Sequence, residues 1–391
     1  MIKINCLVLL LFIMGISNLR SQDYSNDNKL FETISWQEFF NRLDANPNLI
    51  FFDIRTPGER FDTSRYKSYN QGKIKGAIET DFFNFDGFYP EYVKYKKDTI
   101  YLYCSHSRRS RLLSKRLSDS SFAHIVNING GISLLNTFER QIEKRDRFYT
   151  TNLKYKTVSP FYFIDNLRNN DIQFIDVRPD SQYYAISNDE RDNSYGKIEN
   201  VIHIPYDKIM DNLGLIEKSK TILMFDNDGE LAPIAAEFLV EKEYRVSVLL
   251  FGLANLQSVI PSTKRSFFNT KYNVILPEEL FVIADYPETV IIDVRTESEF
   301  KSIDSTEWKN VGRLKNAINI PLSTINKSQI EKIKDKKIVL YDIMMHEELY
   351  SFAKQLKEFG IEDFYLLSGG IFQLKWEIAN MGKVDLQKII N

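Results

Sequence analysis

The sequence predicts an α/β protein of three similar domains in tandem, each with a small parallel sheet covered by helices on both faces. Its 391 residues are too many for one ordinary domain of about 100–200 residues. Apolar strands alternate with helical stretches, which is typical of parallel sheets buried on both faces. A strand ending in Asp-x-Arg recurs at intervals of 123 and 117 residues, at Asp53-Ile54-Arg55, Asp176-Val177-Arg178 and Asp293-Val294-Arg295. We therefore expect domains at residues 30–145, 155–262 and 273–388.

Each copy presents the same elements in the same order. The first helix begins at a capping box in the first copy, Ser35 with Glu38, and at a proline in the other two. After the Asp-x-Arg strand, each copy has a glycine with a basic and an apolar residue, at Gly72-Lys73-Ile74, Gly196-Lys197-Ile198 and Gly312-Arg313-Leu314. The next long strand is expected at Thr99–Tyr103, Thr221–Phe225 and Lys337–Tyr341. A turn, an amphipathic helix and a last strand with a glycine turn complete each copy, and linkers are expected near residues 141–156 and 261–273.

Residues 1–21 are expected to form a secretory signal and not part of the fold. Lys3 supplies the positive start, an apolar run covers Ile4–Ile16, and small polar residues follow. Thirteen residues are too few to span a bilayer, which takes about 20 in a helix. We expect an exported protein, periplasmic or extracellular, with no transmembrane span in the mature chain; the alternative is an uncleaved anchor. Abundant Lys, Asn, Ile, Phe and Tyr indicate an AT-rich bacterial genome. Cleavage would remove Cys6 and leave Cys104 as the one cysteine.

The composition argues against several classes of protein. With 51 basic and 53 acidic residues the net charge is −2, which excludes a globally cationic binder, so nucleic acid is not an expected partner. Two cysteines are too few for a disulfide scaffold or a cysteine-based structural zinc site. The four histidines lack the spacing of metal ligands, and we expect neither a metal nor a cofactor: they are His106, His124, His203 and His346.

The turn after the fourth strand differs between the copies. Ligands of such sheets bind beyond the carboxyl ends of the strands, and this turn lies there. Its first residue is Cys104 in the first copy, Asp226 in the second and Asp342 in the third, so the first alone supplies a nucleophile. Backbone N–H groups that converge at a helix N-terminus lower a thiol pKa and bind anions, so we expect a thiolate. The expected active loop consists of Cys104, Ser105, His106, Ser107, Arg108, Arg109 and Ser110.

The residues after this cysteine are strongly basic. We expect Arg109 to contact the ligand. Further cations follow at Arg108, Arg111, Lys115 and Arg116, and we expect some of them to lie on the solvated outer face of the following helix. Leu112, Leu113 and Leu117 are expected on the buried face of that helix. The alternative for Cys104 is a small buried apolar residue without chemistry, which is the usual place of a free cysteine.

Four motifs in this order resemble the rhodanese (sulfurtransferase) family. In the first copy they are the Asp-x-Arg strand, Gly72-Lys73-Ile74-Lys75-Gly76-Ala77, the Cys104 loop closed by Arg109-Ser110, and Gly130-Gly131-Ile132. The resemblance covers nearly the whole mature chain as three tandem rhodanese-like domains. Lys73 replaces a more usual histidine, and Ser107 replaces a common glycine. The four residues between Cys104 and Arg109 match the sulfurtransferase loop, whereas the related phosphatase loop is one residue longer.

The resemblance implies transfer of a sulfur atom through Cys104. The thiolate would take the outer sulfur of a small anionic donor such as thiosulfate, and a thiol or cyanide would accept it from the persulfide. Loop N–H groups of residues 105–109 would stabilise the persulfide, and Arg109 would orient the donor. The Asp-x-Arg pairs, which occur in all three copies, are expected to be structural ion pairs.

The loops of the second and third copies lack a thiol and carry acidic residues. We expect them to repel an anionic donor and to leave two domains that can bind a protein partner. Asp226-x-Asp228-Gly229 also resembles, over a few residues, a haloacid-dehalogenase motif and a calcium loop. Three hypotheses remain open: an exported sulfurtransferase, a non-catalytic interaction or scaffold protein, and a phosphatase or arsenate reductase that uses Cys104.

Overall fold

The computed structural model describes residues 30–381 and residue 390. The expected signal, residues 1–21, and the end of the third expected domain, residues 382–388, lie outside the described residues. Of the described residues, 30–279 belong to one compact unit that holds the first two domains, and those from Leu280 onward belong to a second. Within the described part of the chain, none of the helices combines the length and the apolar character that a membrane span requires.

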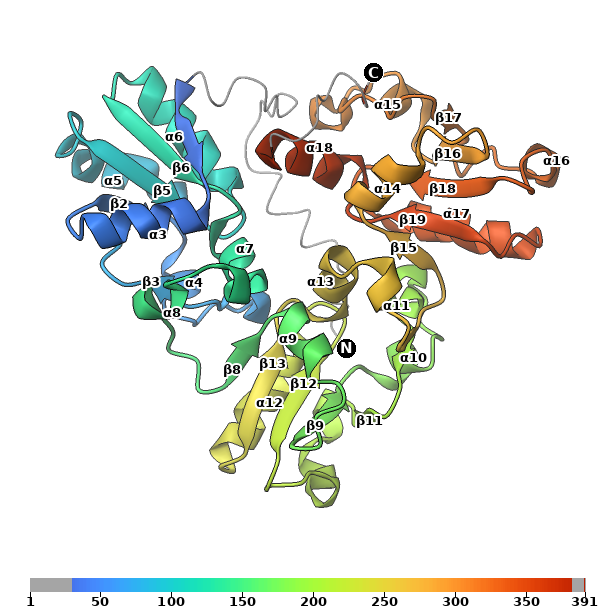
Figure 1. Cartoon of the computed structure of the whole chain (residues 1–391), viewed down its shortest axis with the longest axis horizontal. Coiled ribbons are helices and arrows are strands. Elements are labelled where there is room, and N and C mark those ends of the chain that lie inside the picture. The colour runs from blue at the N-terminus through green and yellow to red at the C-terminus, as the bar shows by residue number, and fades with distance from the viewer. Residues whose placement is uncertain (1–29, 382–389, 391) are drawn as a thin grey trace. The chain divides into compact units, whose positions relative to one another are not determined.

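Domain 1 is a five-stranded parallel sheet in the order β1-β6-β5-β2-β4 (Figure 1). Its strands are β1 (Glu32–Ile34), β2 (Ile50–Asp53), β3 (Lys73–Ile74), β4 (Ile78–Glu79), β5 (Thr99–Tyr103), β6 (His124–Ile128) and β7 (Tyr149–Thr150). Its helices are α3 (Trp36–Ala45), α4 (Pro57–Arg60), α5 (Phe85–Val93), α6 (Arg108–Asp119), α7 (Gly131–Thr137) and α8 (Arg145–Phe148), with the 3-10 turns η2 (Lys67–Tyr69), η3 (Phe82–Asn84) and η4 (Glu139–Gln141).

Domain 2 repeats this order, as β8-β13-β12-β9-β11, in the same compact unit. Its strands are β8 (Lys156–Val158), β9 (Ile172–Asp176), β10 (Lys197–Ile198), β11 (Ile202–His203), β12 (Thr221–Phe225), β13 (Arg245–Leu249) and β14 (Phe268–Asn269). Its helices are α9 (Pro160–Asp165), α10 (Asp180–Tyr183), α11 (Glu190–Ser194), α12 (Leu231–Glu241) and α13 (Gly252–Val259), with the 3-10 turns η5 (Tyr206–Lys208), η6 (Met210–Leu215) and η7 (Ser262–Lys264).

Domain 3 has the same order again, β15-β19-β18-β16-β17. Its strands are β15 (Asn273–Ile275), β16 (Thr289–Asp293), β17 (Ile318–Asn319), β18 (Lys337–Tyr341) and β19 (Phe364–Leu367). Its helices are α14 (Pro277–Ile283), α15 (Glu297–Phe300), α16 (Lys327–Glu331), α17 (Glu347–Glu358) and α18 (Gly370–Met381), with the 3-10 turn η8 (Glu307–Lys309). Three parallel sheets of one topology confirm the predicted fold class.

Side chains of successive strand residues point to opposite faces of the sheet, and each face packs against its own apolar core. In domain 1 Phe51 points to the core that contains α3 and α7, and Phe52 points to the core that contains α5 and α6. Helix α6 buries Leu113 and Leu117, as its period predicts. The expectation for Leu112 was wrong, because its side chain is exposed. The buried residues of α6 are instead Ser110, Arg111, Leu113, Ser114 and Leu117, which recur at the three- and four-residue spacing of one helix face.

The Asp-x-Arg motif forms a buried ion pair at the end of the second strand in each domain. The Arg Nη2 to Asp Oδ2 distance is 2.6 Å in all three, at Asp53–Arg55, Asp176–Arg178 and Asp293–Arg295. The same Nη2 also donates to the carbonyl of the recurring glycine at 2.8 Å, which is Gly72, Gly196 or Gly312. Each arginine therefore ties the strand end to the loop that carries the Gly-basic-apolar motif.

The expected linkers contain structure of their own. After domain 1, β7 pairs antiparallel with β3, and after domain 2, β14 pairs antiparallel with β10. Gly72 has a φ of +65°, and a Cβ atom there would lie 2.4 Å from the Thr150 carbonyl oxygen, so this close pairing requires a glycine. The polar composition that suggested a linker belongs to short edge strands that pair by backbone hydrogen bonds.

We predict that Arg178→Leu destabilises domain 2 by about 3–5 kcal/mol, because it leaves the Asp176 carboxylate buried without its partner. Hydrogen–deuterium exchange of β9 and β12 reports this local stability. Arg168→Leu, at an exposed position of the same domain, is the matched control with an expected effect below about 0.5 kcal/mol. Equal exchange in the two variants would contradict the structural role of the pair.

Candidate active site

Cys104 lies directly after β5 and four residues before α6, at the carboxyl edge of the sheet. Its side chain is 1% exposed. The Sγ atom lies 3.7 Å from Ser110 Oγ, and that hydroxyl donates to Asn127 Oδ1 at 2.6 Å. The hydroxyl of Ser110 is therefore the polar group next to the sulfur, and Asn127 of β6 orients it.

The loop around Cys104 depends on an unusual backbone conformation at its fourth residue. Ser107 has a φ of +71°, and the equivalent residues Gly229 and Met345 have φ values of +80° and +60°. In Ser107, Oγ accepts a hydrogen bond from the Gly130 N–H at 2.7 Å and donates to the Ile128 carbonyl at 3.3 Å. These bonds stabilise a serine where a left-handed conformation favours glycine.

Helix α7 holds the loop from the other side. The N–H groups of Ile132 and Ser133 donate to the carbonyl oxygens of Cys104 and Ser105 at 2.9 and 3.0 Å. A Cβ atom at Gly131 would lie 2.3 Å from the Ser105 carbonyl oxygen, so the close approach of helix and loop requires this glycine. The Gly-Gly-Ile motif thus fixes the two carbonyl groups at the start of the Cys104 loop.

Arg109 is paired with Glu59, a partner that the sequence analysis did not identify. Its Nη1 and Nη2 atoms donate to the two carboxylate oxygens of Glu59 at 2.8 and 2.5 Å, and Nη2 also donates to Ser105 Oγ at 2.8 Å. Burial opposes ionisation of Glu59, but the hydrogen bonds from Arg109 outweigh it and lower the pKa to about 2. Glu59 also completes a capping box with Thr56 at the start of α4, which is the one signal that could have drawn attention to it.

The remaining loop residues lie at the outer side. His106 is exposed, and its ring centroid lies 6.0 Å from that of Tyr69 and 5.5 Å from that of Phe251 in domain 2. Arg108 begins α6 and is half-buried. The loop thus brings together Cys104, Ser105, Arg109 and Ser110, and places His106 against domain 2.

In domains 2 and 3 an aspartate side chain occupies the equivalent loop. Asp226 accepts hydrogen bonds from the N–H groups of Gly229, Leu231 and Ala232, with the Gly229 and Ala232 bonds at 2.6 and 3.1 Å. Asp342 accepts from the N–H groups of Met344, Met345 and His346 at 3.1, 2.6 and 2.6 Å. Both carboxylates are buried. The aspartate side chain therefore already occupies the loop N–H groups, and this is a second obstacle to an anionic donor besides the repulsion expected from the sequence.

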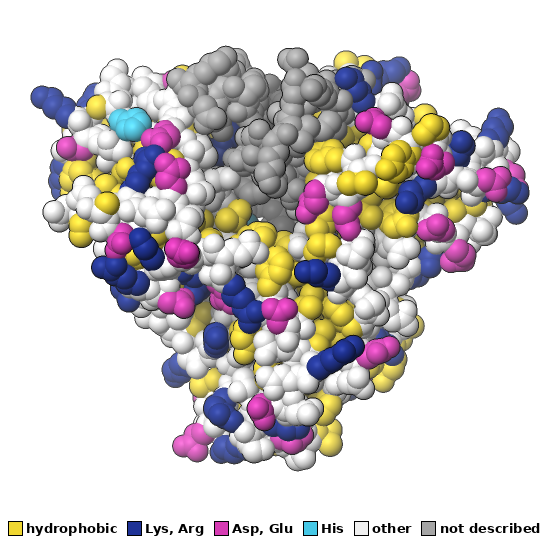
Figure 2. Space-filling view, viewed as in Figure 1, with side chains coloured by type: hydrophobic (Ala, Val, Ile, Leu, Met, Phe, Trp, Pro, Cys, Tyr) yellow, Lys and Arg dark blue, Asp and Glu magenta, His cyan; other side chains and the backbone are white. Residues whose placement is uncertain are grey.

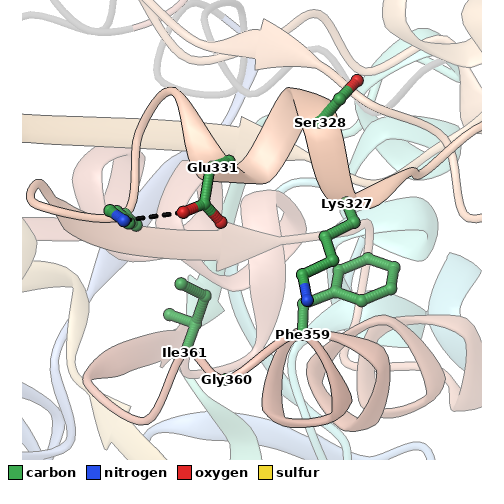
Figure 3. Close-up of a pocket in the computed structure, with 7 residues that line it drawn as sticks. Lys327, Ser328, Glu331, Phe359, Gly360 and Ile361 are labelled. Carbon is green, nitrogen blue, oxygen red and sulfur yellow. Dashed lines mark hydrogen bonds and ion pairs between the residues drawn. The ribbon is translucent and has the colours of Figure 1, made fainter.

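Two further features of the described residues concern metal binding and cavities. The described residues contain no group of three or more His, Cys, Asp or Glu side chains that could hold a metal ion. A shallow cavity of about 610 Å³ lies in domain 3 (Figure 3), between α16 and the turn after α17; its lining residues are Lys327, Ser328, Glu331, Lys334, Phe359, Gly360 and Ile361. The lining precedes β18 and β19, so this cavity lies at the amino ends of the strands, opposite to the loop of Asp342.

Charge on the visible surface is mixed. In Figure 2, Lys and Arg side chains alternate with Asp and Glu over the face shown, and no large area of that face carries a single sign. This pattern agrees with the net charge of −2.

A family model described as the rhodanese-like domain matches residues 35–136, 159–258 and 277–376, well over half of the chain. The chain belongs to the rhodanese-like family. Its fold and its cysteine loop support sulfurtransferase-type chemistry in general. All three rhodanese-like domains have the Asp-x-Arg pair and the glycine turn, and within the described residues the cysteine at the loop position occurs in domain 1 alone. No curated protein matches the sequence.

Solved structures with a similar fold include a thiosulfate sulfurtransferase from Pseudomonas aeruginosa, with 15% identity, a TM-score of 0.24 and coverage of 88% of this chain and 65% of that one. A complex of EanB with hercynine has 14% identity, a TM-score of 0.28 and coverage of 88% and 95%. A rhodanese-like domain protein from Staphylococcus aureus has 22% identity, a TM-score of 0.22 and coverage of 26% and 90%. At these identities and scores the neighbours carry no argument about activity.

We predict that Glu59→Gln destabilises domain 1 by about 2–3 kcal/mol at neutral pH, because Arg109 loses its charged partner. The pKa of Glu59 is lowered in the folded state, so its contribution is complete above the ordinary carboxyl pKa and is lost as the pH falls toward about 2. The difference in unfolding free energy between wild type and variant should therefore be constant above about pH 5 and shrink below it.

Urea unfolding monitored at several pH values measures this difference. Glu91→Gln is the matched control, since Glu91 pairs with the exposed Lys94 in the same domain. A difference between wild type and Glu59→Gln that does not change between pH 6 and pH 3 would contradict the assignment.

Proposed function

We propose that domain 1 is a sulfurtransferase that moves a sulfane sulfur from a small anionic donor, such as thiosulfate, through a persulfide on Cys104. The Cys104 thiolate attacks the outer sulfur of thiosulfate, the S–S bond of the donor breaks, and sulfite leaves with the bonding electrons. A cyanide ion or a thiolate then attacks the outer sulfur of the persulfide and releases the Cys104 thiolate. Each step transfers one sulfur atom and needs no external oxidant or reductant.

The observation that carries this proposal is the contrast between three loops of one topology. The loops of Asp226 and Asp342 bind their own carboxylate with three N–H groups each. The equivalent residue of domain 1 is Cys104, which lacks a carboxylate, and its thiol contacts Ser110. A persulfide extends from the same position by one more sulfur atom and carries a negative charge, so the loop N–H groups and the N-terminus of α6 can stabilise it.

The position of Arg109 supports a role in orienting the donor. It lies beside Ser105 with a rigid bidentate partner in Glu59, so its guanidinium is held in one place at the mouth of the loop. The pair with Glu59 reduces its net charge, and Arg109 therefore acts through directed N–H donors more than through its charge. We further propose that the protein is exported, and that domains 2 and 3, with their thiol-free loops, serve as partner-binding or scaffold domains.

We predict that the full chain gains the mass of one sulfur atom after incubation with thiosulfate, and that cyanide removes it with release of thiocyanate. Intact-mass and peptide mass spectrometry locate the added sulfur, which should lie on the peptide that contains Cys104. Cys104→Ala, checked for folding by circular dichroism, should show no gain.

Two results would overturn the proposal. If thiosulfate and other sulfane donors add no sulfur, or if the gain survives in Cys104→Ala, the sulfurtransferase assignment fails. Hydrolysis of an aryl phosphate or reduction of arsenate that depends on Cys104, without sulfur gain, would identify the phosphatase or arsenate-reductase alternative. Absence of all three activities would leave the scaffold function.

A further inference from the structure

The cysteine-free loop of domain 2 binds domain 1 through Glu230, the fifth residue of that loop. One carboxylate oxygen of Glu230 accepts from the Lys67 N–H at 2.8 Å. The other accepts from the Ser68 N–H at 3.1 Å and from the Ser68 hydroxyl. Hydrogen bonds to a carboxylate are stronger than neutral ones, and these three converge on a single half-buried side chain. Glu230 therefore ties domain 2 to the 3-10 turn η2 of domain 1.

The turn η2 borders the Cys104 loop. It ends at Tyr69, whose ring meets the His106 ring edge-on, with an interplanar angle of 89°. Burial and the charge of Glu59 raise the pKa of Tyr69 while Arg109 opposes the shift, so the phenol lies within the field of the pair that flanks the loop. The position of η2 thus decides where an aromatic ring lies at the mouth of the site.

Domain 2 also contacts His106 directly, through the ring of Phe251 at a centroid distance of 5.5 Å. Phe251 has a φ of +54°, at the position where the other domains have Gly130 and Gly369. A phenylalanine in this conformation is strained, and strain of this kind persists where a side chain is needed in one place. A Cβ atom at Gly229, next to Glu230, would lie 2.9 Å from the Phe251 Cα, so the two domain 2 elements that reach domain 1 are adjacent to each other.

We propose that Glu230 is a positioning residue for the Cys104 site: it holds η2 so that Tyr69 packs against His106 and closes one side of the mouth. The expected effect of Glu230 on sulfur transfer rests on the proposed function, whereas its effect on the position of η2 does not. The thiol-free loop of domain 2 would thus shape the site of domain 1. In the equivalent positions domain 1 has Arg108 and domain 3 has His346, neither of which is a carboxylate.

The first test measures access to Cys104 in the full-length protein. Glu230→Ala should accelerate alkylation of Cys104 by iodoacetamide about tenfold, because the three hydrogen bonds that hold η2 are lost. Peptide mass spectrometry distinguishes Cys104 from Cys6. Ser68→Ala, a smaller change in the partner, should act in the same direction, and the double variant should add little to Glu230→Ala. The matched control is Glu237→Gln, because Glu237 also joins domain 2 to domain 1 but binds only the Lys67 ammonium at 2.7 Å in an exposed pair.

The second test measures sulfur transfer and separates KM from kcat. Glu230→Ala should raise the KM for thiosulfate by about tenfold with little change in the thermal unfolding midpoint, and Glu230→Gln, which keeps one acceptor oxygen, should recover part of the loss. If wild-type protein transfers no sulfur, the proposed function fails, and the alkylation rates still decide the positioning role. Alkylation rates of Glu230→Ala and Ser68→Ala equal to wild type would overturn that role, as would an equal effect of Glu237→Gln.

Discussion

The buried ion pair between Asp53 and Arg55 is the interaction on which the candidate site depends. Arg55 ties the end of β2 to the Gly72 carbonyl, while Asp53 accepts a hydrogen bond from the Tyr103 hydroxyl at 2.7 Å. Tyr103 is the last residue of β5 and directly precedes Cys104. The pair therefore joins β5, which leads to Cys104, to β2, which leads to α4 and Glu59. The carboxylate of Glu59 in turn binds Arg109. Removing either charge would leave the other buried at this junction.

A common backbone with different side chains explains why one family fold contains one thiol site and two closed loops. In all three domains the fourth strand ends at the same edge of the sheet, and the following turn has a left-handed fourth residue. The first residue then determines the chemistry. The aspartate side chain bends back and accepts N–H groups of its own loop, whereas the Cys104 thiol contacts Ser110. In the proposed function the N–H groups of the Cys104 loop bind the anion instead. Domain 2 has in addition acquired Glu230, which directs its loop toward domain 1.

The parts of this structure that could be predicted from sequence are those fixed by residues close together in the chain. The Asp and Arg of the Asp-x-Arg pair are two residues apart, and the strand, turn and helix around Cys104 cover about 20 residues. Such short patterns can be recognised in the sequence. The partners of Arg109 and of Lys67 are 50 and 163 residues away, and no local pattern indicates them. The linker strands were missed because two-residue edge strands have almost no apolar period. Leu112 was misplaced because the helix begins at Arg108 and its buried face starts at Ser110.

In the proposed function, the N–H groups of the Cys104 loop stabilise a persulfide, while the equivalent groups of the other two domains are already bound to aspartate. Amide chemical shifts of ¹⁵N-labelled protein, recorded before and after loading with thiosulfate, measure this difference between the loops. We expect large shifts for residues 105–110, with residues 227–232 and 343–348 unchanged. Shifts in the aspartate loops, or loading of Cys104 without any change in residues 105–110, would contradict it.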